Sequence, residues 1–239
     1  MMILALESSA AACSAALCRD GELVAQSYQN SGLTHSRTLL PMVRDMLANC
    51  GESLDHVDVI AVAAGPGSFT GLRIGVSTAK GLAWPEDKPC APCSTLESMA
   101  WPLAHMEGRV IVCAMDARRH QVYNALFLAT GCALERLTPD RAISLEELGE
   151  ELKKYENSKI VVGDGAKLCY NTLTEWGHAL TLAPPNLRMQ SAWGVARAAQ
   201  ELAERDALVS ASELTPMYHR LSQAERERLE RERQAQPQK

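Results

Sequence analysis

A glycine turn between two apolar segments is the first part of the sequence whose residue types suggest chemistry. In AVAAGPGSFTGLRIGVSTAKGLAW, residues 61–84, Gly65 and Gly67 join a strand-like run to a helical pattern. Such a junction often holds phosphate, because glycine lets backbone N–H groups approach a ligand at a helix start. The stretch lacks the Gly-Lys-Ser/Thr of a P-loop. Its Gly65-x-Gly67-x-x-x-Gly71 spacing fits an extended dinucleotide pattern, so dinucleotide binding stays open as an alternative.

A carboxylate and two hydroxyls end the first apolar segment of the chain. The strand-like run MILAL leads directly into Glu7, Ser8 and Ser9. In an actin-like ATPase, a carboxylate at this place manages the metal and the N–H groups of the following turn bind phosphate. This turn contains no glycine, which makes close backbone approach to a phosphate harder. The sequence therefore favours a strand end with hydrogen-bonding serines over a phosphate site.

Two other motifs have the spacing of a reactive site without completing one. His35 begins a predicted helix, but the second histidine of a helical metal site would stand at position 39, which is Leu39. Cys90 and Cys93 have redox-motif spacing, yet they are followed by Ser94, which starts a helix-capping pattern. We interpret the pair as the end of a strand and keep a redox site as the less favoured alternative. The sequence thus predicts no catalytic residue, no metal and no cofactor.

The composition describes an ordinary soluble protein. The chain has 239 residues, of which 46% are hydrophobic and 22% charged, enough for one compact unit or two lobes of about 100 residues each. A net charge of −5 and 5% aromatic residues argue against unaided binding to nucleic acid. No signal peptide and no membrane span is predicted. The irregularly spaced cysteines are typical of reduced core residues, so we expect a cytoplasmic protein.

The order of predicted elements repeats itself along the chain. Glu7 and Asp116 both end a first strand, and each is followed by a hairpin signal and then by helix, strand, glycine turn and helix. This order indicates a duplicated β-β-β-α-β-α unit, the α/β architecture of actin-like ATPases within the ribonuclease H-like (ASKHA) group. We predict an N-terminal lobe over 1–106, a C-terminal lobe over 107–212, and a charged segment over 213–239.

Small residues form a stripe on the helix predicted after the glycine turn. Gly71, Gly75 and Ala79 are spaced four apart, beside the apolar Leu72 and Val76. A glycine inside a helix costs up to about 1 kcal/mol relative to alanine. The stripe therefore indicates close approach by another backbone, which belongs either to this fold or to a partner helix.

Three motifs carry a resemblance to a known family. They are HSRTLLP at residues 35–41, GPGSFTGLRIG at 65–75 and AMDARRHQVY at 114–123. In order and spacing the sequence resembles the TsaB (YeaZ) family of the bacterial tRNA threonylcarbamoyladenosine pathway over almost its whole length. The departures are modest: the family usually has Asp where Glu7 stands, and commonly Gly where His120 stands.

The resemblance implies an actin-like fold and a non-catalytic scaffold or activator role. The partner would be TsaD, the subunit that transfers threonylcarbamoyl from threonylcarbamoyl-adenylate to N6 of the adenosine next to the anticodon. The P-loop ATPase TsaE would join the complex, TsaC would make the adenylate, and tRNA would be bound only through the complex. Isolated TsaB proteins tend to form homodimers. The alternative is a stand-alone actin-like ATPase or small-molecule kinase.

The resemblance also places the partner interface on the helices predicted over 34–50 and 68–84. The candidate interface residues are His35, Leu39, Val43, Met46, Gly71, Leu72, Gly75, Val76 and Ala79. Arg73 is a candidate contact to a partner carboxylate or another anion near the helix start.

Overall fold

Two mixed β-sheets form the frame of the computed structural model, which describes residues 1–118 and 120–219. The first sheet has the strand order β3-β2-β1-β4-β5, and the second has the order β11-β10-β6-β7-β8 with β9 paired to β7. The strands of the first sheet are β1 (Met2–Glu7), β2 (Cys13–Arg19), β3 (Glu22–Gln29), β4 (Val59–Gly65) and β5 (Cys90–Ser94). Those of the second are β6 (Val110–Asp116), β7 (Gln121–Ala129), β8 (Leu134–Arg136), β9 (Arg141–Ser144), β10 (Lys159–Val162) and β11 (Leu180–Leu182).

The two sheets have the same topology, which confirms the predicted duplication and the actin-like fold. In each, the first strand pairs antiparallel with the second and parallel with a later strand: β1 with β2 and β4, β6 with β7 and β10. The first hairpin turns at Asp20 and Gly21, both with positive φ, as a tight hairpin turn requires. β1 reads as an unbroken apolar run because helices cover both faces of its sheet.

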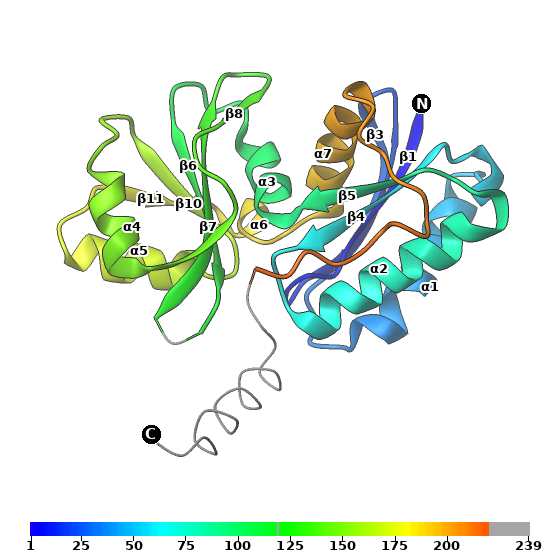
Figure 1. The fold of residues 1–239 in the computed structure, drawn as a ribbon, viewed down its shortest axis with the longest axis horizontal. Coiled ribbons are helices and arrows are strands. Elements are labelled where there is room, and N and C mark those ends of the chain that lie inside the picture. The colour runs from blue at the N-terminus through cyan, green and yellow to red at the C-terminus, as the bar shows by residue number, and fades with distance from the viewer. Residues whose placement is uncertain (119, 220–239) are drawn as a thin grey trace, which may run out of the picture.

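Helices pack on the sheets in five alternating layers (Figure 1). The helices are α1 (His35–Asn49), α2 (Phe69–Ala83), α3 (Thr95–Ala100), α4 (Leu145–Leu152), α5 (Ala166–Glu175), α6 (Pro185–Arg188) and α7 (Ala192–Glu204). α1 and α2 cover the outer face of the first sheet, and α4 and α5 cover the outer face of the second. α3 and α7 lie between the sheets, so this central layer joins the lobes.

The central helix α7 changes the predicted division of the chain. Its alanine-rich face, with Ala192, Val195, Ala196 and Ala199, packs against β1, β2 and β4 of the first sheet. The range 107–212 that we assigned to a C-terminal lobe therefore supplies a layer of the N-terminal lobe. Sequence order could not reveal this, because α7 follows the last strand of the second sheet. Of the predicted charged segment 213–239, residues 220–239 lie outside the described part of the chain.

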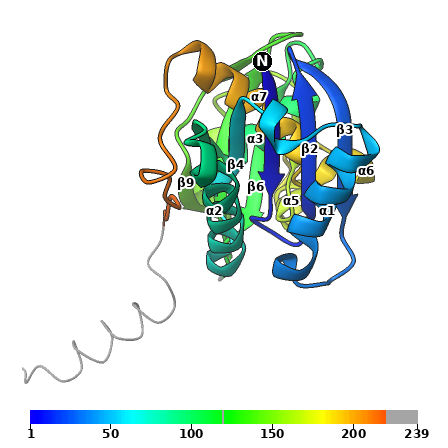
Figure 2. The same cartoon turned by 90° about the vertical axis from the view of Figure 1, so that its right-hand side faces the viewer.

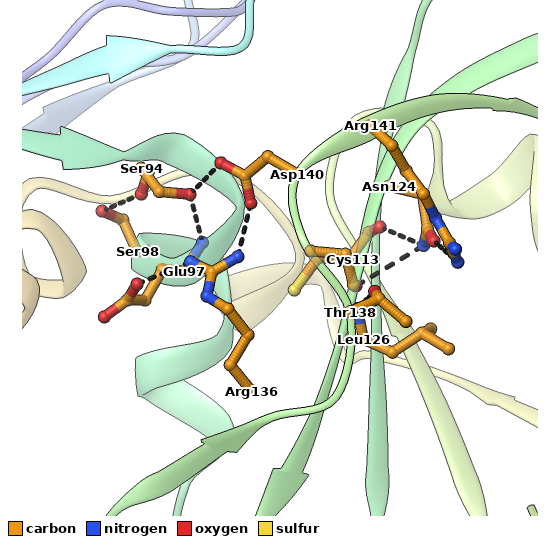
Figure 3. A network of polar contacts seen from close by, with 11 residues as sticks. Ser94, Glu97, Ser98, Cys113, Asn124, Leu126, Arg136, Thr138, Asp140 and Arg141 are labelled. Atoms are coloured by element: carbon orange, nitrogen blue, oxygen red, sulfur yellow. Dashed lines mark hydrogen bonds and ion pairs between the residues drawn. The ribbon is translucent and has the colours of Figure 1, made fainter.

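Polar contacts add a second connection between the lobes (Figure 3). Arg136 at the end of β8 donates to Asp140 and to Glu97 of α3, each at 2.6 Å. Asp140 also accepts a 2.5 Å hydrogen bond from Ser94, the N-cap of α3. The Arg136 guanidinium carbon lies 4.6 Å from the centre of the Phe127 ring. This network holds the start of α3 against the second sheet.

Within the described residues, no helix is long and apolar enough to cross a membrane.

Arg136→Ala should lower the free energy of unfolding by about 1–3 kcal/mol, because the carboxylate of Asp140 would stay mostly buried and lose the positive charge that it pairs with. The Asp140 side chain is 11% exposed. Urea denaturation of the variant measures the loss. Lys153→Ala is the matched control, since its ion pair with Glu150 is largely exposed and should change stability by less than about 0.5 kcal/mol. Equal stability of the two variants would contradict a structural role for the network.

Candidate functional site

The end of β1 and the start of the turn to β2 are buried although they carry three polar side chains. Glu7, Ser8 and Ser9 are each at most 1% exposed. The Ser9 amide donates a 2.5 Å hydrogen bond to Glu7 Oε1, so the turn uses this N–H internally. Glu7 Oε2 and the Ser9 hydroxyl have no hydrogen-bond partner among the described residues. The Ser9 amide is thus satisfied within the turn and is not free for a ligand.

Helix α2 covers this turn at very short range. The Ser68 amide donates to Ser9 O at 2.7 Å, and the Ser8 hydroxyl donates to Gly71 O at 2.9 Å. A Cβ atom on Gly71 would overlap the carbonyl oxygen of Ser8, and one on Gly75 would lie 2.5 Å from Ser8 Oγ. Glycine is required at both positions by this contact. The small-residue stripe therefore has a cause inside the fold.

The same turn also anchors α1. The His35 ring Nε2 lies 2.7 Å from Ala10 O and, as a donor to that carbonyl, must carry the proton. His35 is partly buried at the first position of the helix. It therefore ties the start of α1 to the β1–β2 turn.

Most of the predicted interface residues lie in the core of the first lobe. Leu39, Val43, Met46, Gly71, Leu72, Gly75, Val76 and Ala79 are all buried. They form the apolar face of each helix, and this face is turned toward the first sheet. A partner that meets α1 and α2 in this arrangement would contact their other faces.

Arg73 lies on an exposed face of α2 and contacts the C-terminal part of the chain. Its Nε donates to the hydroxyl of Tyr218 at 3.0 Å, and its guanidinium carbon lies 5.9 Å from the centre of that ring. Tyr218 also stacks on Phe69, with ring centres 4.5 Å apart. No local sequence pattern around Tyr218 indicates that it meets the start of α2.

Two residues of the second lobe form a further polar pair whose charge acts on Glu7, and the sequence analysis predicted neither. Gln190 is fully buried and donates to Asp164 Oδ1 at 3.1 Å, while its Oε1 has no partner among the described residues. Asp164 lies in the turn after β10, where Gly163 has a positive φ and a Cβ on Gly165 would lie 2.9 Å from the Asp116 amide. Gly163 and Gly165 could have marked this turn in the sequence, because two glycines also stand at the end of β4.

Burial controls the electrostatics of this site. Burial raises the pKa of Glu7 from 4.5 to about 7; the contacts from Ser9 oppose the shift, and the charge of Asp164 adds to it. Burial also raises the pKa of Asp164, although its side chain keeps contact with solvent. The arrangement can therefore hold a proton on Glu7 near neutral pH.

The remaining candidate motifs do not form a site in the described residues. Cys90 packs on the α2 side of the first sheet and Cys93 on the α7 side, so alternation along β5 points their thiols to opposite faces. Burial raises the pKa of both thiols. Residues 1–118 and 120–219 contain no group of three His, Cys, Asp or Glu side chains placed to hold a metal ion.

Glu7 should make the stability of the protein depend on pH. The pKa of Glu7 is about 7 in the folded protein and 4.5 in the unfolded chain. The folded state therefore binds this proton more tightly. The stability that results is fully present below pH 4.5 and is lost as the pH rises through about 7. We expect urea denaturation to show a loss of about 2 kcal/mol between about pH 5 and pH 7.5 that is absent in Glu7→Gln. The same pH dependence in both proteins would contradict a raised pKa at Glu7.

Comparisons with known proteins agree with the fold and with the motifs. The family model described as "TsaD: tRNA N6-adenosine threonylcarbamoyltransferase" matches residues 29–225. The chain is 36% identical over 168 residues to the tRNA threonylcarbamoyladenosine biosynthesis protein TsaB of Bacillus subtilis (strain 168), which covers 70% of this chain and 73% of that protein. It is 34% identical over 167 residues to TsaB of Escherichia coli (strain K12), covering 69% and 72%.

A solved structure extends the similarity over nearly the whole fold. YeaZ from Pseudomonas aeruginosa superposes with a TM-score of 0.75 at 26% identity, covering 91% of this chain and 99% of that one. The sequence relatives and this likeness together show that the chain belongs to the TsaB family.

Proposed function

We propose that this chain is a non-catalytic subunit in the synthesis of tRNA threonylcarbamoyladenosine, and that it acts by pairing with TsaD. The names of its TsaB relatives support the pathway. The match to the TsaD family model supports descent from a common two-lobed ancestor, and such relatives commonly associate through equivalent surfaces. In this role the chain positions the transferase, which moves threonylcarbamoyl from its adenylate to N6 of the adenosine next to the anticodon.

The closed β1–β2 turn is the observation that carries the non-catalytic role. A phosphate needs free N–H groups that it can reach from solvent. Here Glu7 accepts from the Ser9 amide, and α2 covers Ser8 and Ser9 by direct backbone contact. Nucleotide chemistry at this turn would require α2 to move away from the residues that anchor it.

The outer face of α1 and α2 is the docking surface that we propose for TsaD. We define this outer helix face by Leu40, Arg44, Ile74, Thr78 and Leu82. Thr38, Met42 and Asp45 line a groove with residues of β3, on the side of α1 away from α2. A turn of 100° per residue places Leu40 and Arg44 on the opposite side of α1, and Ile74, Thr78 and Leu82 recur every four residues along one side of α2. Leu40 is 52% exposed, whereas Ile74 and Leu82 are partly buried.

The two helices also carry a charge opposite to that of the whole chain. Helices α1 and α2 together contain four basic residues and one acidic residue, so their formal charge is +3 (four minus one), whereas the whole chain has −5. These residues are Arg37, Arg44, Arg73 and Lys80, with Asp45. An acidic partner surface would be attracted to this side of the molecule. A second copy of the chain would occupy the same face when TsaD is absent, which gives the homodimer.

The remaining partners follow from the same proposal. TsaE joins the complex that this chain forms with TsaD, TsaC supplies the adenylate, and tRNA is bound through the complex. All eight cysteines of the chain are free, which suits a reducing cytoplasm.

The isolated chain should show no ATP hydrolysis above the buffer rate, because the β1–β2 turn offers no open phosphate site. A coupled phosphate-release assay with Mg-ATP measures this. Saturable Mg-ATP binding that Glu7→Ala abolishes would instead favour a stand-alone ATPase or small-molecule kinase.

Leu40→Asp should weaken binding to TsaD at least about tenfold, because it places a charge in the apolar part of the outer helix face. Isothermal titration calorimetry with purified TsaD measures the affinity. Leu23→Asp on β3 is the matched control, since Leu23 is 44% exposed and lies away from this face. An unchanged affinity for Leu40→Asp would place the interface elsewhere.

A further inference from the structure

The chain after α7 returns to the first lobe and lies along α2 (Figures 1 and 2). We call residues 209–218 the strap. Val209 exchanges two backbone hydrogen bonds with Cys90, at 2.8 and 2.9 Å, and so covers the free edge of β5. Further along, Ala211 and Leu214 are buried in the same core as Val76 and Ala79 of α2.

The strap ends on the first turns of α2. The Met217 amide donates to Ala64 O at the end of β4, at 2.7 Å. A Cβ on Gly65 would overlap the carbonyl oxygen of Met217. The strap therefore packs so closely on the turn before α2 that position 65 must be glycine. The next residue, Tyr218, makes the ring stack on Phe69 and the hydrogen bond with Arg73.

The strap and the outer helix face lie on different sides of α2. The strap contacts Phe69, Arg73 and Lys80, whose spacings of four and seven residues place them on one side of the helix. Ile74, Thr78 and Leu82 form the other side, which is turned toward α1. The strap can therefore support α2 without covering the outer helix face.

The start of α2 needs such support because of its own sequence. Gly71 and Gly75 fall within its first two turns, where glycine lowers helix stability by about 1 kcal/mol each. Local propensity does not hold these turns, so tertiary contacts must. They are provided by the β1–β2 turn on the inner side and by the strap on the exposed side.

We propose that the strap is a brace that holds the start of α2 in the position required for partner docking. The strap would then control the affinity of the outer helix face for TsaD. This inference rests on the proposed pairing with TsaD. In this arrangement Tyr218 acts through α2 and is a positioning residue rather than a contact to the partner.

Tyr218→Ala tests the brace, and Tyr28→Ala is the matched control. Both tyrosines are exposed to a similar degree, 43% and 46%, but Tyr28 lies on β3 away from α2. Loss of the ring stack should speed amide hydrogen exchange in residues 69–75 about three- to tenfold and weaken TsaD binding by a similar factor. Hydrogen exchange of the free, full-length protein and calorimetry with TsaD give the two values. Tyr28→Ala should change neither value.

Three other outcomes have distinct meanings. Unchanged exchange in residues 69–75 would overturn the brace. Weaker TsaD binding with unchanged exchange would also overturn it, because Tyr218 would then be a direct contact. If the unaltered protein does not bind TsaD, the proposed function fails and the docking role of the strap fails with it, while the exchange of Tyr218→Ala still decides whether the strap holds α2.

Discussion

The carbonyl oxygen of Ser8 lies so close to α2 that a side chain at position 71 would overlap it. This contact places α2 on the β1–β2 turn, and the His35–Ala10 hydrogen bond places α1 on the same turn. One short turn therefore sets the positions of both outer helices of the first lobe. The buried state of Glu7, the closure of the turn and the orientation of the outer helix face all depend on it.

The duplicated fold makes the two lobes comparable at this point. In the second lobe, Gly163 and Gly165 allow the turn after β10 to approach Ala114 and Asp116 at the end of β6. Asp116 is exposed there, whereas Glu7 at the equivalent strand end is buried. In the first lobe, helix contacts therefore enclose the carboxylate at the strand end, while the second lobe leaves its carboxylate open to solvent.

The sequence predicted the repeated order of strands and helices because buried strands, hairpin glycines and caps are local signals. The helix-capping pattern at Ser94 is an example that the structure confirms, because the Ser94 side chain is the N-cap of α3. It also marked Gly71 and Gly75 as sites of close approach without naming the neighbour. That neighbour, Ser8, is more than sixty residues away, and no local pattern connects the two. Arg136, Gln190 and Tyr218 were missed for the same reason, since each acquires its role from residues distant in sequence.

The position of α7 has a consequence for the synthesis of the protein. The second lobe is inserted between β5 and α7, so the face of the first sheet that Trp101 and Ala104 cover in part is completed only by α7, which follows nearly all of the second lobe. A chain leaving the ribosome shows α1 and α2 early but lacks α7 until about residue 204 has emerged. The first lobe therefore closes last, although it is translated first, and an incomplete chain lacks the finished lobe on which its outer helices would be presented.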